Sequence, residues 1–277
     1  MTGVSRRRGI GFAVAHQLAS LGADLFIHHY RPHDVEQPWG GDDLEAVRAD
    51  LRAALRPDAR FADLSADLSR PEAPQQLFET AVKLTGHVDI LVANHARSGG
   101  DGSVLDMTPD RLDAFWQTNT RSTVLLTSAF ARQLAGTPDV PARPGERGAT
   151  HGPFPGPRGR VFWMTSGQIH GPMRGEVAYA ASKAALAGAT ATVAAELLDL
   201  GIVLNTIDPG PVNTGYLDPA STDRSLESLE ELIVTTAFGR YGRPQDVAEL
   251  IGWLCTEHGS WIVGQVLTSD GGFGLAR

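Results

Sequence analysis

Apolar residues follow two different spacings along almost the whole chain. Short, mostly apolar runs indicate buried strands, whereas apolar positions three or four residues apart indicate the helices that cover them. The predicted strands lie at residues 24–30, 61–68, 88–93, 160–166, 202–207 and 263–267. The predicted helices lie at residues 9–21, 42–55, 71–84, 108–134 (interrupted near Asn119), 179–200, 225–233 and 246–255. This alternation predicts an α/β fold in which residues 1–277 form a single domain around a doubly wound parallel sheet.

Two stretches depart from this alternation. Residues 137–158 are rich in proline and glycine and show no periodicity, so we expect a loop excursion from the surface. In residues 215–240, Leu226, Leu229 and Ile233 fall on one side of a short amphipathic helix. We expect this second stretch to cover the substrate as an apolar lid.

The composition excludes several classes of function. The net charge of −8 and the pI near 5.6 argue against a general nucleic-acid-binding or anionic-membrane surface. No apolar run approaches the roughly 18 residues of a membrane span. Cys255 is the single cysteine, which leaves no internal disulfide and suits a reducing compartment. We therefore expect a cytoplasmic protein, although the Ser-Arg-Arg-Arg stretch at residues 5–8, before an apolar stretch, imitates a targeting signal.

The candidate chemistry is concentrated around one helix. Tyr179 and Lys183 are four residues apart, so they share one face of that predicted helix. A nearby positive charge favours the phenolate, which makes Tyr179 a usable proton donor and acceptor near neutral pH. Ser166 ends the preceding predicted strand, where open α/β sheets carry their chemistry. These side chains are candidates for polarising and protonating a carbonyl oxygen, although a Tyr-x-x-x-Lys spacing alone also arises by chance.

A glycine-rich turn, residues 2–11 (Thr-Gly-Val-Ser-Arg-Arg-Arg-Gly-Ile-Gly), opens the first predicted helix. Glycines there let the backbone approach a pyrophosphate, whose charge the free N–H groups of the helix start stabilise. Further marks follow in order: Asp67, Asn94, Asn119, Ser166, Tyr179 with Lys183, Pro209-Gly210, and Asp-Gly-Gly at 270–272. From Thr2 to Gly272 the chain resembles the short-chain dehydrogenase/reductase family, including its 3-oxoacyl-[acyl-carrier-protein] reductases. The resemblance implies a Rossmann-type fold and an oxidoreductase acting on CH–OH or C=O groups with NAD(P).

The resemblance also assigns catalytic roles. Tyr179 would be the general acid that protonates the carbonyl oxygen as hydride arrives from the nicotinamide. Lys183 would lower the pKa of the tyrosine and hydrogen-bond the nicotinamide ribose, and Ser166 would orient the substrate oxygen. Asn119 resembles the asparagine that holds a water in the proton relay; as an alternative, it is only a polar residue that breaks the helix.

The cofactor-binding set follows from the same resemblance. Thr214 looks like the residue that bonds the nicotinamide carboxamide. Asp67 and Leu68 look like the adenine contacts, although residues 63–65 repeat the same Asp-Leu-Ser tripeptide. The full predicted set is Gly3, Ser5, Arg8, Gly9, Ile10, Gly11, Arg31, Asp67, Leu68, Asn94, Ala96, Tyr179, Lys183, Pro209, Gly210, Val212 and Thr214.

The end of the second strand of this fold selects the cofactor. A carboxylate there would bond the ribose 2′-OH of NAD, whereas a nearby arginine accommodates the 2′-phosphate of NADP. The expected acidic position is His29, and the nearest acid, Asp34, lies too far along the sequence. Because Arg8 and Arg31 flank the site, we predict NADPH, with NAD(H) as the alternative.

Two departures from the family pattern stand out. The turn between Gly3 and Gly9 is longer than in the relatives, so one or two of its arginines are extra. Residues 93–96 read Ala-Asn-His-Ala where relatives read Asn-Asn-Ala-Gly, and His95 either borders the cofactor or is structural. The neighbouring histidines at 28, 29 and 33 invite a metal interpretation, but partners at metal-ligand spacing are missing, so we predict no metal.

These observations predict an NADPH-dependent enzyme that reduces a ketone, with a 3-oxoacyl thioester as the default substrate by resemblance. One alternative is an NAD-dependent dehydrogenase of a small alcohol, sugar or steroid. A second is a cofactor-binding regulator without turnover, against which the intact set Asn119, Ser166, Tyr179 and Lys183 speaks. By analogy with the family we expect a homo-oligomer, a tetramer or a dimer, and no nucleic-acid or membrane partner.

The first strand of the sheet is apparently truncated. In the family the glycine-rich turn follows a central apolar strand, whereas here only Met1 precedes the turn. Buried backbone groups left unpaired cost about 1–3 kcal/mol each. We therefore expect either a native start further upstream or a poorly stable chain. Equal melting temperatures for this chain and an extended one would contradict that expectation.

Overall fold

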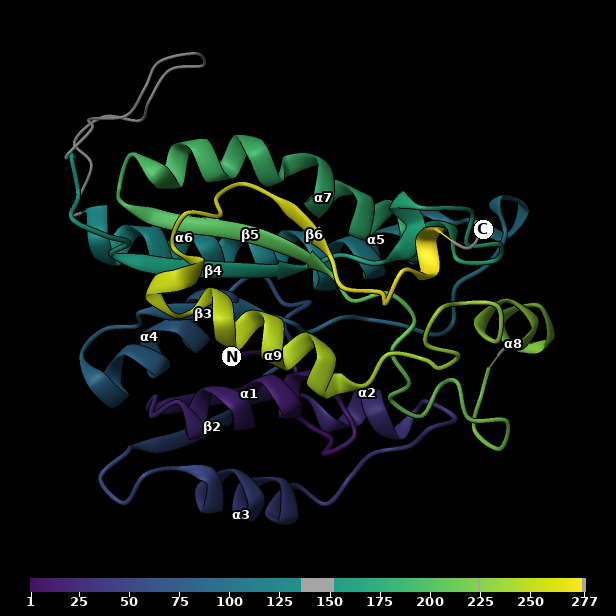
Figure 1. Cartoon of the computed structure of the whole chain (residues 1–277), viewed down its shortest axis with the longest axis horizontal. Helices are drawn as coiled ribbons and strands as arrows, with labels where there is room; N and C mark the ends of the chain where they lie inside the picture. Colours follow the sequence, from purple (N-terminus) through teal and green to yellow (C-terminus); the bar gives the residue numbers. More distant parts are fainter. Residues whose placement is uncertain (136–151, 224, 276–277) are drawn as a thin grey trace.

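Parallel strands form the centre of the protein in a computed structural model that describes residues 1–135, 152–223 and 225–275 (Figure 1). The strands are β1 (Leu25–His29), β2 (Phe61–Ser65), β3 (Ile90–Ala93), β4 (Gly159–Met164), β5 (Ile202–Asp208) and β6 (Val266–Thr268). One sheet pairs β1 with β2, and the other has the order β3-β4-β5-β6, with every pairing in these ladders parallel. The predicted α/β class with a parallel sheet is confirmed.

Residues 1–4 lie between the two sheets. The Thr2 amide donates to the Val92 carbonyl of β3 over 2.9 Å, while the Val4 amide donates to the His28 carbonyl of β1 over 2.9 Å. The Met1 carbonyl accepts from the His28 amide, also at 2.9 Å. This short segment therefore joins β1 to β3 at the position of the predicted truncated strand. Burial lowers the pKa of the Met1 amino group to about 5.

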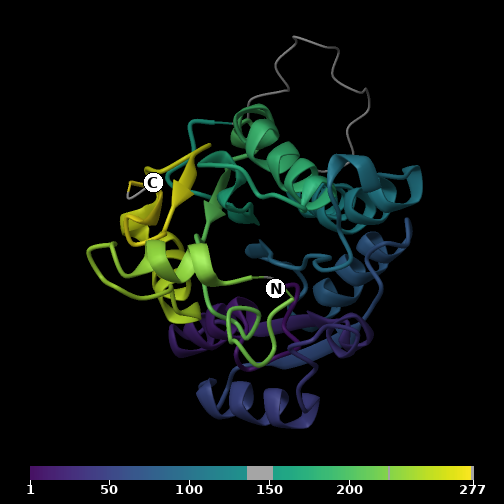
Figure 2. The ribbon, with the colours of Figure 1, turned by 90° about the vertical axis from the view of Figure 1, so that its right-hand side faces the viewer.

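Helices cover both faces of the strands, and the side chains of each strand alternate between them. On one face Phe162, Met164 and Ile207 pack in the same core as α1 (Ile10–Ser20), α3 (Leu44–Ala54) and α9 (Pro244–Leu254). On the other, Val161 and Trp163 pack with α4 (Ala73–Thr85), α6 (Ser122–Ala135) and α7 (Val177–Leu198). Figure 2 shows α6 and α7 on one side of the strands and α1 and α3 on the other. The result is a three-layer, doubly wound arrangement.

The order of helices and strands agrees with the sequence prediction, with small shifts at the ends. The predicted helix at 108–134 is α5 (Pro109–Phe115), a π-helical turn (Trp116–Arg121) and α6, so the interruption near Asn119 is a change of helix type. The helix at 225–233 is α8 (Glu227–Ile233). A short helix, α2 (Arg31–Val35), was not predicted. Of the predicted loop, residues 137–151 lie outside the described residues, and 152–158 contain no helix or strand.

The carboxyl ends of β3, β4 and β5 meet at one edge of the sheet. Met164 is in register with Ile207, so Ser166 lies just beyond β4 and Pro209-Gly210 just beyond β5. Gly210 has a φ of +63°, and a Cβ there would lie 2.4 Å from the Cβ of Asp270. Only glycine fits that turn, which sends the chain out across the sheet edge.

Candidate active site

A cleft of about 830 Å³ opens at this carboxyl edge. Its walls come from the glycine-rich turn, the segments after β1, β2, β3, β4 and β5, and the first turns of α7. The sequence-predicted residues that line it are Gly3, Ser5, Gly9, Ile10, Gly11, Asp67, Leu68, Asn94, Ala96, Ser166, Tyr179, Lys183, Pro209, Gly210, Val212 and Thr214. Residues far apart in the chain thus converge where open α/β sheets bind their ligands.

The glycine-rich turn leaves room for a ligand by close backbone packing. A Cβ on Gly11 would lie 2.1 Å from the Gly3 carbonyl oxygen, and one on Gly3 would lie 2.8 Å from the Cα of His95. Asn94 holds the turn from below, because its side-chain amide donates to the Gly3 carbonyl over 3.0 Å. The helix α1 begins directly after this turn, and Gly9, Ile10 and Gly11 at its start line the cleft. The first N–H groups of a helix have no acceptor within it, so such an end is suited to bind a phosphate.

Tyr179 and Lys183 lie in the first two turns of α7, on the cleft wall. The Lys183 Nζ lies 5.9 Å from the centroid of the Tyr179 ring. Lys183 is buried, and its ammonium donates to the Met164 carbonyl over 2.9 Å. Burial lowers the pKa of Lys183 to about 8. A cation with little solvent around it acts strongly on the neighbouring phenol, because water screens it weakly.

The end of β4 is tied to the same helix. The Thr165 hydroxyl donates to the Lys183 carbonyl over 2.9 Å, next to the Lys183–Met164 bond. Ser166 follows in extended backbone conformation and begins the short 3-10 turn Gly167–Ile169. The serine that lines the cleft is therefore fixed relative to the helix that carries Tyr179.

Asn119 is fully buried behind the cleft, in the π-helical turn. Its side-chain oxygen accepts from the Arg97 amide at 2.6 Å, and its side-chain nitrogen donates to the Ser182 hydroxyl over 2.9 Å. Asn119 thus connects the segment after β3 to α7. Its role in a proton relay stays a prediction.

Two buried histidines support the turn from the sheet side. His95 is bonded through Nδ1 to the Thr2 hydroxyl at 2.7 Å and through Nε2 to the Ser122 hydroxyl at 2.6 Å. His28 meets His95 edge-on, with ring centroids 6.1 Å apart, and its Nδ1 accepts from the Gly3 amide at 3.3 Å. Burial lowers the pKa of His28 to about 4 and that of His95 well below its usual value. Both histidines line the cleft as well as supporting it.

The three arginines of the turn point in different directions. The Arg7 guanidinium binds Asp42 through two hydrogen bonds, of 3.0 and 2.8 Å, and lowers the pKa of that carboxyl to about 2. Arg8, predicted to bind the cofactor, pairs instead with Asp218 at 2.7 Å and is exposed; it is not among the described residues that line the cleft. Arg6 does line the cleft, where its guanidinium donates to the Thr214 carbonyl over 3.0 Å and lies 3.5 Å from Asp34.

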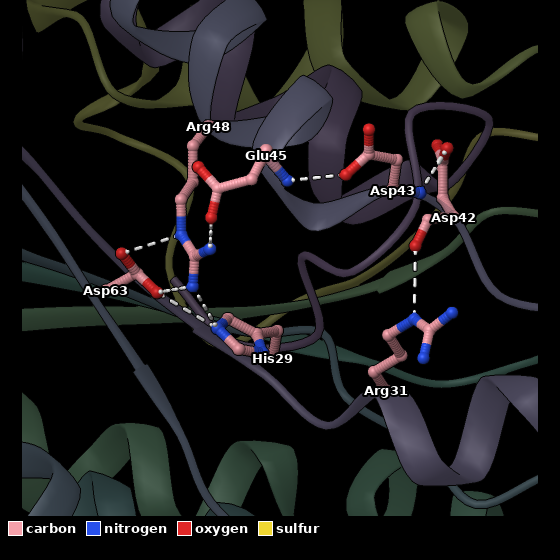
Figure 3. Close-up of polar contacts among 7 residues, drawn as sticks. All are labelled: His29, Arg31, Asp42, Asp43, Glu45, Arg48 and Asp63. Atoms are coloured by element: carbon pink, nitrogen blue, oxygen red, sulfur yellow. Dashed lines mark hydrogen bonds and ion pairs between the residues drawn. The ribbon is translucent and has the colours of Figure 1, made fainter.

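The predicted specificity position, His29, is not among the described residues that line the cleft, and its side chain points toward Asp63 and Arg48 (Figure 3). His29 is buried, its Nε2 is 3.0 Å from Asp63, and Arg48 binds the same carboxylate at 2.7 Å. Arg31 donates to the Asp42 carbonyl over 3.3 Å and likewise does not reach the lining that the described residues form. The start of helix α2 at Arg31 explains this placement, since it carries His33 and Asp34 to the cleft instead.

The segment 215–240 contributes polar rather than apolar groups. Tyr216 and Asp223 line the cleft. Leu226 and Ile233 are buried, each 7 % exposed, but neither belongs to the lining among the described residues. Other lining residues that were not predicted are Tyr30, Trp39, Arg97, Asp101, Met173 and Arg174. Two further lining residues outside the predicted set had a sequence signal: Arg6, from the extra length of its turn, and His95, from its departure from the family pattern.

Within residues 1–135, 152–223 and 225–275, no group of three or more histidine, cysteine or acidic side chains is arranged to hold a metal ion. The helices of that same part of the chain include none long and apolar enough to cross a membrane.

The chain is similar to known proteins over its whole length. The family model described as short chain dehydrogenase matches residues 1–225. The uncharacterized oxidoreductase YjdA of Bacillus subtilis is 32% identical, covering 99% of this chain and 95% of the relative. NADPH-dependent aldehyde reductase 2 of Arabidopsis thaliana is 30% identical, covering 98% and 92%. A short-chain dehydrogenase/reductase structure from Serratia marcescens has a TM-score of 0.74 at 28% identity, covering 99% and 96%.

The fold, the cleft and these similarities together show that the chain belongs to the short-chain dehydrogenase/reductase family. It is an oxidoreductase of CH–OH and C=O groups, in a family that binds NAD(P). The family resemblance seen in the sequence is confirmed.

Proposed function

We propose that this protein uses NADPH to reduce a ketone to a secondary alcohol. The observation that carries the proposal is the buried Lys183 ammonium 5.9 Å from the Tyr179 ring, on the wall of a cleft that Ser166 also lines. A phenol beside a desolvated cation is suited to give up and regain a proton at neutral pH.

Each side chain has a defined task in this reaction. When bound, the nicotinamide supplies the hydride. The Tyr179 hydroxyl donates a proton to the carbonyl oxygen, and the Lys183 ammonium stabilises the phenolate that remains. The Ser166 hydroxyl donates a hydrogen bond to the same oxygen as negative charge develops there, when the interaction contributes most. Asn119 holds the segment of Arg97 against α7 and so keeps the cleft in shape.

Arg6 is the group best suited to an NADPH 2′-phosphate. It is half-buried in the cleft, and its contact with Asp34 is long, at 3.5 Å. Arg8 and Arg31, which the sequence favoured, lie outside the described lining. A guanidinium binds a phosphate through short, charge-assisted hydrogen bonds. Arg97, also on the lining, adds a second guanidinium to the cleft.

One observation favours the alternative, an NAD-dependent dehydrogenase. Asp34 and Glu36 line the same part of the cleft as Arg6, and a carboxylate there would accept from the ribose hydroxyls of NAD. The alternative is also supported by the structure of acetoin dehydrogenase from Enterobacter cloacae, whose name indicates a dehydrogenase activity. That structure is similar to this chain, with a TM-score of 0.74 at 27% identity, covering 100% of this chain and 96% of that one.

The lining also bears on the substrate. The 3-oxoacyl thioester expected by resemblance would place an acyl chain against the segment 215–240. That segment offers Tyr216 and Asp223, whereas Leu226 and Ile233 are buried away from the described lining. This composition favours a small ketone that carries hydroxyl groups over a long acyl chain.

Exposed apolar side chains on α5, the π-helical turn and α6 support a homo-oligomer. Leu112, Trp116, Val124 and Leu125 are each 39–49 % exposed there. We propose that a second copy covers them, which light scattering of the purified protein would test.

Turnover of a ketone panel with each cofactor tests the proposed reaction. The panel should contain a small hydroxyketone, an aromatic ketone and a 3-oxoacyl thioester, and NADPH or NADH consumption should be followed by absorbance. We expect the hydroxyketone with NADPH to give the highest kcat/KM. A higher kcat/KM with NADH would favour the alternative, and the absence of turnover with every pair would contradict the proposal.

A further inference from the structure

Asp101 connects the wall of the cleft to the start of α7. One carboxylate oxygen accepts from the Ala178 amide at 3.1 Å and from the Gly102 amide at 2.7 Å. The other accepts from the Tyr179 amide at 2.7 Å. The Val177 amide donates to the Gly102 carbonyl over 3.2 Å, next to these bonds. Asp101 and Gly102 therefore join the segment after β3 to the start of α7, 77 residues further along the chain.

The helix needs a partner at this end. The first N–H groups of any α-helix have no acceptor within the helix. Glu176, at the N-cap position of α7, makes no side-chain capping bond. Asp101, in a loop distant in sequence, accepts hydrogen bonds from these amides instead, and one of them is the amide of Tyr179 itself. The backbone from which the phenol extends is thus fixed by a charged group on the cleft wall.

The position of the Asp101 charge also bears on the Tyr179 phenol. The N-terminal end of a helix carries a partial positive charge, which a carboxylate there neutralises. Lys183 acts on the phenol from the next turn of α7, 5.9 Å from the ring centroid. Phe115 packs edge-on against the Tyr179 ring, with centroids 6.4 Å apart, and Arg97 stacks on Phe115 at 5.6 Å. The Tyr179 ring therefore lies near the Lys183 ammonium and on the first turn of a helix whose positive end Asp101 offsets.

We propose that Asp101 is a positioning residue for Tyr179: it fixes the first turn of α7 against the cleft wall and tunes the protonation of the phenol. This inference rests on the proposed reductase function for its kinetic consequence. Its electrostatic consequence needs no turnover. Removing the Asp101 charge exposes the positive helix end, so the phenolate becomes more favourable.

The test compares Asp101→Asn with Asp106→Asn. Asp106 is a matched control, because its carboxylate caps the nearby 3-10 turn Val104–Asp106 through Ser103 and, among the described residues, accepts no hydrogen bond from α7. The chain has four tyrosines, so near-ultraviolet titration of phenolate absorbance can isolate Tyr179 by subtracting the same background carrying Tyr179→Phe. Arg97, Lys183 and Glu176 are the same in every variant, so the difference reports Asp101.

We expect Tyr179 in Asp101→Asn to titrate lower by a few tenths of a pH unit to about one unit. The kcat for reduction should fall about tenfold while the NADPH Kd changes less than about threefold, because the position of the phenol changes and the cofactor contacts do not. Asp106→Asn should match the wild type in both readouts.

Three results would overturn the proposal: an unchanged Tyr179 titration in Asp101→Asn, an equal shift in Asp106→Asn, or a loss of kcat that only follows a loss of folded protein by circular dichroism. If the wild type itself shows no turnover, the reductase function fails. The titration still decides the role of Asp101 in that case.

Discussion

The two ends of the cleft hold their charges in different ways. At the α7 end, Lys183 is buried and donates to a backbone carbonyl, and no carboxylate in the described residues lies within ion-pair distance of its ammonium. At the end formed by the glycine-rich turn and α2, the arginines pair with acids: Arg7 with Asp42 and Arg8 with Asp218.

This difference distinguishes the end of the cleft proposed for catalysis from the end proposed for cofactor selectivity. The Lys183 ammonium has no carboxylate partner among the described residues and little water around it, so its charge acts on the neighbouring Tyr179. The cost of burying this charge appears as the lowered pKa of Lys183. A cation already paired with a carboxylate has little attraction left for a phosphate. We therefore propose that selectivity for the cofactor depends on Arg6, whose contact with Asp34 is 3.5 Å long.

The largest expected effect is at the α7 end. Lys183→Met replaces the ammonium by an apolar side chain of similar length in a buried position. We expect kcat to fall about 10²–10⁴-fold, the size of a general acid–base contribution, and NADPH binding to weaken as well. The melting temperature should stay level or rise, because the desolvation cost of the ammonium disappears.

Lys83→Met, on the exposed face of α4, is the matched control and should leave turnover unchanged. Rapid-mixing kinetics and cofactor fluorescence titration provide the two measurements. A kcat for Lys183→Met within about tenfold of wild type would mean that the ammonium does not assist the phenol.

Arg6→Ala tests the other end. A charge-assisted hydrogen bond contributes about 1.5–3 kcal/mol, so NADPH affinity should fall roughly ten- to a hundredfold while NADH affinity changes little. Arg8→Ala and Arg31→Ala should leave the ratio of the two Kd values near that of the wild type. If Arg8→Ala has the larger effect, the assignment of Arg6 is wrong.

Burial of His28 below the glycine-rich turn predicts a pH dependence of stability. The pKa of His28 is lowered to about 4 in the folded protein, while the unfolded chain binds a proton near pH 6.5. Below about pH 6.5 the unfolded state takes up a proton that the folded state does not, so stability falls with pH until about pH 4. Between pH 7 and pH 5 this contributes about 2 kcal/mol.

Urea unfolding of wild type and His28→Gln at both pH values measures this contribution. The wild type should lose about 2 kcal/mol more than the variant over that interval. Parallel losses in the two proteins would show that His28 is not the group responsible.

The smallest effect is expected at His29. Because His29 faces Asp63 at 3.0 Å rather than the cleft, His29→Asp should lower the free energy of unfolding by about 1 kcal/mol through carboxylate repulsion that Arg48 partly offsets. Cofactor preference should not change. His33→Asp, on the cleft lining, is the comparison that should shift preference toward NADH. A shift caused by His29→Asp would contradict the geometry in Figure 3.

The sequence identified the α7 end because its geometry is local. Tyr179 and Lys183 are placed by the period of one helix, and Ser166 by the end of one strand. The break near Asn119 was also readable, since a buried polar residue interrupts an amphipathic pattern there. Periodicity brought Tyr179, Lys183 and Ser166 together, and the family resemblance distinguished this set from a chance spacing.

The other end could not be predicted in the same way. Which of Arg6, Arg8 and Arg31 reaches the cleft depends on distant acids, Asp34, Asp42 and Asp218, and on a five-residue helix after β1. Spacing along the chain contains no information on such pairings. Asp101 was missed for the same reason, because its partners lie 77 and 78 residues away on α7.

The central claim is that the Tyr179 hydroxyl supplies the proton in carbonyl reduction. Tyr179→Phe removes that hydroxyl and keeps the ring that packs on Phe115. The measurement is the kcat of ketone reduction together with the Kd of NADPH for the variant and the wild type. We predict a loss of about 10²–10⁴ in kcat with Kd within a few-fold. A variant that retains the wild-type kcat would contradict the account.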